Sequence, residues 1–156
     1  MKTVYILNGP NLNLLGSREP QIYGYATLSS IEKRCERLAQ QLDVNMVFRQ
    51  SNHEGDLVDW IQEARLAADG VILNPAGLSF YSISVKDAVK ALGKPCIELH
   101  MSNVHARDLD DSVVSKVATA VICGLGAYGY EVALSAMAGL LSSSGNFQND
   151  QKEASA

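Results

Sequence analysis

Glu98 and His100 are the pair of residues whose types and spacing point most directly to chemistry. They lie two positions apart in a short apolar run that predicts a strand, so both side chains should leave the same face. A carboxylate placed in this way can hold the imidazole in one tautomer and prepare His100 to act as a general acid. A buried histidine satisfied by a structural glutamate would show the same spacing. The backbone N–H groups of Met101 and Ser102, with the Ser102 hydroxyl, could bind a carboxylate beside His100, which favours a reactive pocket.

Arg18 and Tyr23 form a second candidate pair, in a segment without clear periodicity. The pKa of a free tyrosine is about 10, too high for a base near neutrality, but a neighbouring guanidinium favours the phenolate. Tyr23 could then abstract a proton. Taken alone, the two residues fit surface packing or a cation–π pair better than catalysis.

Asn11 and Asn74 are neutral amides that could fix a water or stabilise an enolate oxygen, although asparagine is also common in turns. The histidines at positions 53, 100 and 105 show no i, i+4 helical spacing, and no matched set of carboxylates accompanies them. We therefore expect neither a metal site nor a cofactor.

Five short runs rich in β-branched and apolar residues alternate with longer segments of helical spacing. The runs cover residues 4–7, 44–48, 70–73, 96–99 and 120–123, and helices are expected over 56–68, 84–92 and 128–141 and after a cap at Thr27 or Ser29. This alternation demands parallel crossovers and predicts an α/β fold, a flavodoxin-like three-layer sandwich with a five-stranded parallel sheet. One domain would span residues 1–141, and residues 142–156, with almost nothing to bury, would form a disordered tail.

Ligands of such sheets bind outside the carboxyl ends of the strands. Polar segments follow four of the predicted strands. They cover residues 8–13, 51–54, 74–77, which includes Gly77, and 100–103. We expect these segments to converge on one rim, and the long connection over residues 9–26 to act as a lid.

Length and composition exclude several classes of protein. The 156 residues suit one domain, and a net charge of -4 argues against nucleic acid as a partner. Cys35, Cys96 and Cys123 lie in apolar or helical patterns and are expected to be reduced thiols of the core. No secretory signal and no run long enough to cross a bilayer is recognised, so we expect a cytoplasmic protein without a membrane partner.

The segment from Gly124 to Gly129 fits the GxGxxG pattern between a predicted strand and a helix, as a dinucleotide site requires. It belongs to the last strand–helix unit, however, and the acidic residue expected about 20 positions later would fall in the tail. Tight packing of helix against strand is the preferred interpretation, and a nucleotide-binding module stays as an alternative.

Taken together, the segments resemble the type II 3-dehydroquinate dehydratases. The matching pieces are LNGPNLNLLGSREPQIYG at 7–24, QSNHEG at 50–55, GVILNPAG at 70–77, IELHMSNVHAR at 97–107 and VATAVICGLGAYGY at 117–130. Several motifs in the same order, each at an expected strand end, are far more specific than any one of them.

The resemblance implies that Tyr23, assisted by Arg18, takes a proton from C2 of 3-dehydroquinate. It implies that Asn11 helps to stabilise the resulting enolate through a water, and that His100, oriented by Glu98, protonates the departing C1 hydroxyl. Asn74, Gly77, Met101 and Ser102 would bind the substrate. It also implies that Asp87 extends toward a neighbouring subunit's site and that the chain forms a homo-dodecamer built as a tetramer of trimers.

The sequence departs from the family pattern in two places. Phe80 stands where the family usually has a histidine, and the stretch 108–112 is acidic, shorter by about two residues, and lacks a second arginine. In the family these two groups contact the C4 and C5 hydroxyls of the substrate. A dehydratase with compensating residues is favoured over a divergent paralogue acting on a cyclic hydroxy-acid with fewer ring hydroxyl contacts, and a weak enzyme kept for another role is the third possibility.

Overall fold

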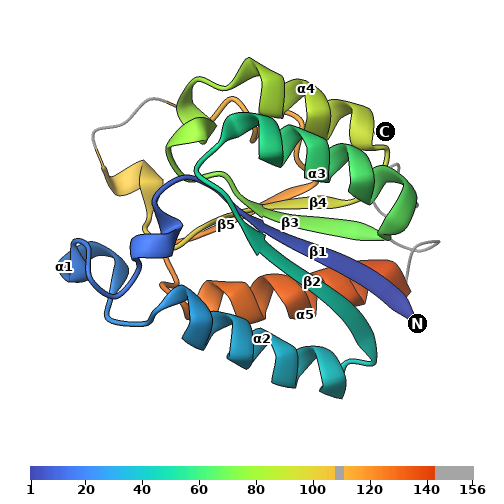
Figure 1. The fold of residues 1–156 in the computed structure, drawn as a ribbon, viewed down its shortest axis with the longest axis horizontal. Coiled ribbons are helices and arrows are strands. Elements are labelled where there is room, and N and C mark those ends of the chain that lie inside the picture. The colour runs from blue at the N-terminus through green and yellow to red at the C-terminus, as the bar shows by residue number, and fades with distance from the viewer. Residues whose placement is uncertain (108–110, 143–156) are drawn as a thin grey trace, which may run out of the picture.

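Five parallel strands form one sheet at the centre of the molecule (Figure 1). The computed structural model describes residues 1–107 and 111–142. The strands are β1 (Lys2–Asn8), β2 (Val44–Gln50), β3 (Gly70–Asn74), β4 (Cys96–His100) and β5 (Ala120–Cys123), and their spatial order is β2-β1-β3-β4-β5. All neighbouring pairs are parallel, so the predicted sheet is confirmed.

Helices cover both faces of the sheet, which makes the three predicted layers. The helices α2 (Leu28–Gln41) and α5 (Tyr128–Ser142) lie on one face, and α3 (Glu54–Ala67) and α4 (Ile83–Leu92) on the other (Figure 1). Each face has its own apolar cluster, because successive side chains of a strand point to opposite sides. Ile6 and Ile72 belong to the α2/α5 cluster, and Leu7 and Leu73 to the α3/α4 cluster.

Capping decides where two of these helices begin. The Thr27 side chain accepts the Ser30 N–H at 3.1 Å, so Thr27 rather than Ser29 caps α2. Ser82 caps α4 in the same way through the N–H of Val85. Along the predicted apolar stripe of α2, Ile31 and Cys35 are buried, while Leu38 and Leu42 are half-buried against the same cluster.

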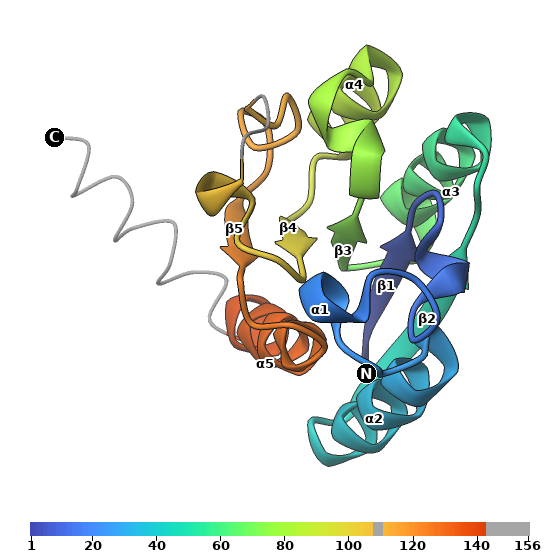
Figure 2. The ribbon, with the colours of Figure 1, turned by 90° about the vertical axis from the view of Figure 1, so that its left-hand side faces the viewer.

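The connection from β1 to α2 contains elements that periodicity did not predict. A 3-10 turn covers Leu12–Leu14 and a single helical turn, α1, covers Pro20–Tyr23. An element of one turn is too short to show a hydrophobic period, and its start is set by Pro20 in the first turn instead. In Figure 2, which looks onto the carboxyl ends of the strands, α1 lies in front of the sheet.

The glycines of the GxGxxG segment pack helix against strand, as predicted. A Cβ added at Gly129 would lie 3.1 Å from the Leu99 side chain of β4, a tight contact, so glycine eases the close approach of α5 to the sheet. Gly124 and Gly126 have φ of 90° and 60°, which builds the turn into α5.

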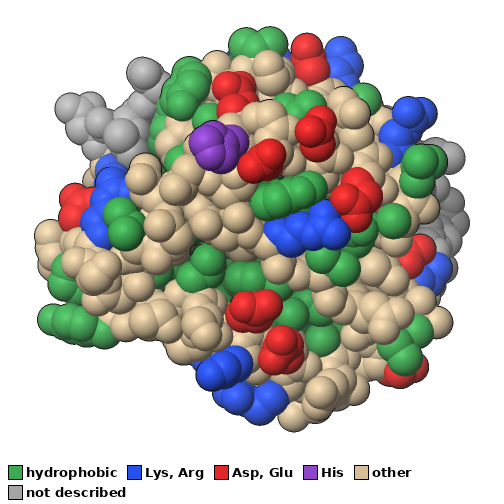
Figure 3. Space-filling model, viewed as in Figure 1, with side chains coloured by type: hydrophobic (Ala, Val, Ile, Leu, Met, Phe, Trp, Pro, Cys, Tyr) green, Lys and Arg blue, Asp and Glu red, His purple; other side chains and the backbone are tan. Residues whose placement is uncertain are grey.

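Cys35 and Cys96 are buried free thiols, and burial raises the pKa of each to about 12. Cys123 is half-buried on β5. Among the described residues, no helix is long and apolar enough to span a membrane. Side chains of both charges are interspersed on the face shown in Figure 3. The expected tail, apart from Ser142, and positions 108–110 of the acidic stretch lie outside the described residues.

Candidate active site

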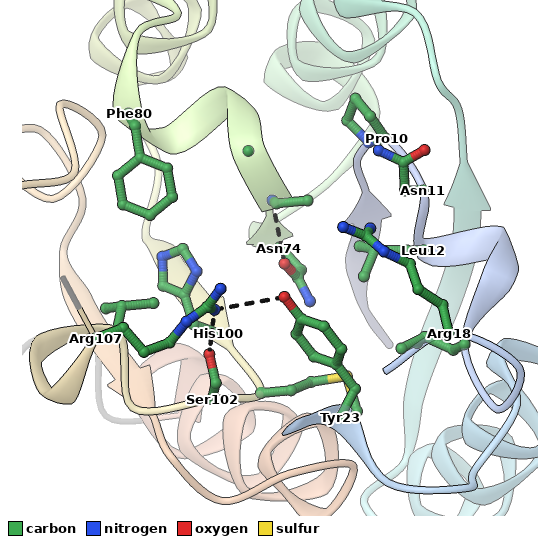
Figure 4. Close-up of a pocket in the computed structure, with 15 residues that line it drawn as sticks. Pro10, Asn11, Leu12, Arg18, Tyr23, Asn74, Phe80, His100, Ser102 and Arg107 are labelled. Atoms are coloured by element: carbon green, nitrogen blue, oxygen red, sulfur yellow. Dashed lines mark hydrogen bonds between the residues drawn. The ribbon is translucent and has the colours of Figure 1, made fainter. Parts of the chain in front are cut away.

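A cavity of about 270 Å³ opens at the carboxyl ends of β1, β3 and β4. Its lining comes from the segments that follow these three strands, including the whole β1–α2 connection. Side chains far apart in sequence therefore meet there (Figure 4). The lining residues are Pro10, Asn11, Leu12, Leu15, Arg18, Tyr23, Asn74, Ala76, Gly77, Phe80, His100, Met101, Ser102, Val104 and Arg107.

Tyr23 ends α1 and turns its hydroxyl into the cavity (Figure 4). Arg107 Nη1 lies 3.4 Å from the Tyr23 hydroxyl, and the guanidinium carbon lies 5.9 Å from the centre of the tyrosine ring. The same Nη1 donates to Ser102 Oγ at 2.9 Å. Arg107 therefore joins the phenol to the polar turn that follows β4.

Arg18, the predicted partner of Tyr23, lines the same cavity but pairs with Glu19 at 3.3 Å. Glu19 has a left-handed φ of 42° and lies between Arg18 and the helical turn that carries Tyr23. In this structure the guanidinium that contacts the Tyr23 hydroxyl is that of Arg107. The Arg18 side chain is 47% exposed and lines the cavity, so Arg18 remains a candidate for the second cation of the site.

Asn11 and Asn74 are fixed differently at the rim. Asn11 has a left-handed φ of 69°, and its N–H donates to Asn52 Oδ1 at 2.9 Å, so the segment after β2 supports the site without lining it. Asn74 is buried, donates to the Tyr130 hydroxyl at 2.9 Å and accepts the Ala76 N–H at 3.2 Å. The Tyr130 hydroxyl in turn donates to Asn8, which leaves the Asn74 amide in a single orientation.

Glu98 and His100 leave the same face of β4, as their spacing predicted. Glu98 Oε2 and His100 Nε2 lie 3.2 Å apart, and both side chains are buried. The carboxylate lies close to Nε2 but off the line of a ring N–H, so the contact is not a linear hydrogen bond. His100 reaches the cavity, whereas Glu98 stands behind it.

Two serines complete the surroundings of Glu98. Ser112 Oγ donates to Oε1 and Ser115 Oγ to Oε2, each at 2.5 Å. Burial alone would raise the pKa of Glu98, but the contacts with His100, Ser112 and Ser115 outweigh it and lower the pKa below its usual value. Glu98 is therefore an anion near neutral pH.

The remaining candidate residues divide between the cavity and the outer surface. Gly77, Met101 and Ser102 line the cavity. Asp87 lies on α4, exposed to solvent and outside the cavity lining. Phe80 packs against His100, with ring centres 6.5 Å apart and planes inclined by 29°.

Sequence reasoning missed the contacts that Arg107, Ser112 and Ser115 make at the site. Arg107 follows the polar turn after β4, and a cation so close to a candidate anion site was a usable signal. The two serines are three positions apart, a spacing that a single turn brings to one side. A buried Glu98 requires hydrogen-bond donors, so such a pair nearby was worth seeking.

Comparison with known proteins identifies the family. The model of the dehydroquinase class II family matches residues 2–138. The chain belongs to the class II dehydroquinase family. It is 52% identical over 141 residues to a 3-dehydroquinate dehydratase of Phenylobacterium zucineum, covering 89% of this chain and 97% of that one. A 3-dehydroquinate dehydratase of Brucella canis is 54% identical over 141 residues, with 89% and 90% covered.

A solved class II structure shares the fold. The type II dehydroquinase of Propionibacterium acnes superposes with a TM-score of 0.85 at 43% identity, covering 88% of this chain and 97% of that one. Within the class II dehydroquinase family, Phe80 is the departure that the structure lets us locate. It places an aromatic ring beside His100, at a position where the family pattern led us to expect a histidine.

Proposed function

We propose that this chain removes water from 3-dehydroquinate to give 3-dehydroshikimate through an enolate. Tyr23 acts as the base and His100 as the general acid. The observation that carries the proposal is that Tyr23, from α1, and His100, from β4, both line one small cavity. The names of the relatives, 3-dehydroquinate dehydratase, support the choice of substrate.

Proton removal from C2 depends on the phenolate form of Tyr23. A guanidinium 3.4 Å from the hydroxyl favours that form by direct charge attraction, and Arg107 supplies it here. Arg18, at the same cavity, adds a second positive charge. The electron pair left at C2 moves onto the C3 oxygen, and Asn11 stabilises this enolate oxygen through a water.

Loss of the C1 hydroxyl depends on His100. As the enolate collapses to the conjugated enone, the C1–O bond breaks and His100 gives its proton to the departing oxygen, which leaves as water. Glu98, an anion 3.2 Å from Nε2, stabilises the protonated ring before this step. Tyr23 then releases the proton it removed to solvent, and His100 takes up a proton from solvent, which restores both groups.

The substrate's carboxylate and C1 hydroxyl bind at the turn after β4 and at the end of β3. Ser102, the Met101 N–H, Asn74 and Gly77 line that side of the cavity. The Arg107–Ser102 hydrogen bond of 2.9 Å brings a positive charge next to the place assigned to the carboxylate.

The Tyr23→Phe variant tests the assignment of the base. Removing the hydroxyl should lower turnover of 3-dehydroquinate by at least about 10³-fold, because no other cavity residue is assigned to the C2 proton. Formation of the conjugated enone is followed by ultraviolet absorbance, with and without EDTA, which should have no effect. Tyr25→Phe is the matched control, since Tyr25 is 82% exposed two positions away. Undiminished turnover by Tyr23→Phe would remove Tyr23 from this role.

A second candidate function is dehydration of a related cyclic hydroxy-acid with fewer ring hydroxyls. The specific observation in its favour is Phe80, whose ring offers no hydrogen bond to a substrate hydroxyl beside His100. A steady-state comparison of 3-dehydroquinate with simpler cyclic hydroxy-ketones separates the two functions. Preference for the simpler compounds would make this candidate the better one.

Assembly belongs to the same proposal. We propose that the chain forms a dodecamer of four trimers, in which Asp87 reaches toward the cavity of a neighbouring copy. Asp87 is exposed on α4 and lies outside its own cavity lining, as this arrangement requires.

A further inference from the structure

Glu98 is a buried carboxylate whose position is set by more than His100. The residue is 0% exposed, and a buried charge is costly unless it is paired and hydrogen-bonded. Oε1 accepts from Ser112 Oγ and Oε2 from Ser115 Oγ, each at 2.5 Å, while Oε2 also faces His100 Nε2 at 3.2 Å. Both oxygens are thus bound, and the carboxylate cannot rotate without losing a hydroxyl.

Backbone contacts fix the direction of the Ser112 hydroxyl. Ser112 Oγ accepts the N–H of Val114 at 3.2 Å and that of Ser115 at 3.4 Å. A hydroxyl has one hydrogen and two lone pairs. Because both lone pairs are used by backbone amides, the hydrogen points to Glu98.

The turn that carries the two serines is itself held firmly. Val114 is 0% exposed in the α3/α4 cluster. The Val113 N–H donates to the Ser79 carbonyl at 2.7 Å, and Ser79 Oγ donates to the Ala76 carbonyl at 2.6 Å. The serine turn is therefore fixed to the same 3-10 segment, Ala76–Phe80, that forms one wall of the cavity.

We propose that Ser112 and Ser115 are positioning residues for the dehydration, acting through Glu98 on His100. Their hydroxyls hold the carboxylate in place 3.2 Å from Nε2, so that Glu98 stabilises the protonated imidazole that gives up its proton. The inference rests on the proposed function. The other titratable or charged groups around the pair are Cys96 on β4 and Arg18, Tyr23 and Arg107 at the cavity, and none of these contacts the Glu98 oxygens through a hydrogen bond among the described residues.

Ser115→Ala is the first test, because the side chain of Ser115 contacts Glu98 without bonding the turn's own backbone. Loss of one hydrogen bond to a charged group should lower kcat roughly tenfold with KM nearly unchanged. The acidic side of the pH profile should move to higher pH, since the ionised form of Glu98 has lost a donor. Ser115→Thr, which keeps a hydroxyl, should restore kcat, and Ser135→Ala, at an exposed serine of α5, should change nothing.

A second measurement reports on His100 without depending on turnover. The ¹⁵N signals of the His100 ring in the full chain should show a changed tautomer balance or titration in Ser115→Ala, and a larger change in Ser112→Ala if that variant folds. Unchanged His100 signals in Ser115→Ala would overturn the proposal, whatever happens to kcat, because a merely structural serine also affects rate. If the parent chain does not convert 3-dehydroquinate, the proposed function fails, and the His100 signals still decide whether the serines position this pair.

Discussion

At the scale of single residues, Phe80 is where we expect the sequence to change specificity. Its ring lies 6.5 Å from the His100 ring and lines the cavity. Val104 extends the apolar lining, so a hydroxyl placed on this side would lose its bonds to water without gaining a partner there. Sites that hydrogen-bond a substrate hydroxyl can prefer that substrate by as much as about 10⁴- to 10⁵-fold over an analogue without the hydroxyl. An aromatic side chain at this position cannot provide that preference.

Phe80→His should therefore improve the use of 3-dehydroquinate. The imidazole would add about one hydrogen bond to a hydroxyl of the substrate ring. The value of kcat/KM should therefore rise roughly tenfold, mainly through a lower KM. Kinetics on 3-dehydroquinate and on an analogue lacking one ring hydroxyl measure the change, which should be smaller for the analogue. Phe80→Leu, which keeps the wall apolar, is the control. Equal kinetics in parent and Phe80→His would mean that other residues already bind those hydroxyls.

At the scale of elements, strands and long helices were predictable because burial imposes a period on them. All five strands, and the helices from Leu28, Glu54, Ile83 and Tyr128, appear within two residues or so of the predicted limits. The one-turn helix α1 has no period to detect. Closeness in sequence led us to predict Arg18 as the partner of Tyr23. The guanidinium next to the Tyr23 hydroxyl is instead that of Arg107, whose position depends on the path of the chain after β4.

The close approach of two strand ends explains a glycine that forms one corner of the site. Gly9 follows β1, donates its N–H to the Asn74 carbonyl at 2.8 Å, and would place a Cβ only 2.5 Å from the Pro75 carbonyl oxygen. Backbone atoms cannot move aside as a flexible side chain can. The turn that begins at Asn74 therefore needs glycine at position 9.

Gly9→Ala should destabilise the fold by about 1–3 kcal/mol, as overpacking does, and should lower activity by displacing the turn after Asn74. Urea unfolding followed by circular dichroism measures the first effect. Gly55→Ala, on α3 with nothing within 4 Å of the added Cβ, is the control and should be neutral or stabilising by up to about 1 kcal/mol. Equal stability of Gly9→Ala and the parent would show that the two strand ends can separate at little cost.

At the scale of the whole molecule, one edge of the sheet exposes apolar side chains. Among the described residues, β5 pairs only with β4, and Val121 in this edge strand is 40% exposed. Leu125 and Tyr128, which follow it, are 47% and 59% exposed. Edge strands of isolated proteins usually carry charges or proline that prevent pairing, so this edge favours contact with another copy, in line with the proposed assembly.

Val121→Lys should reduce the oligomer that the parent chain forms, because each copy would then bring a charge to an apolar contact. Light scattering after gel filtration measures the mass. Leu66→Lys is the matched control, since Leu66 is 89% exposed on α3 and far from β5 in sequence and sheet order.

If Asp87 serves a neighbouring cavity, turnover should fall together with the mass of Val121→Lys, and Asp87→Asn should lower turnover at unchanged mass. A smaller Val121→Lys species that keeps full activity would show that each cavity works alone, and a parent chain that runs as a monomer would remove the assembly itself.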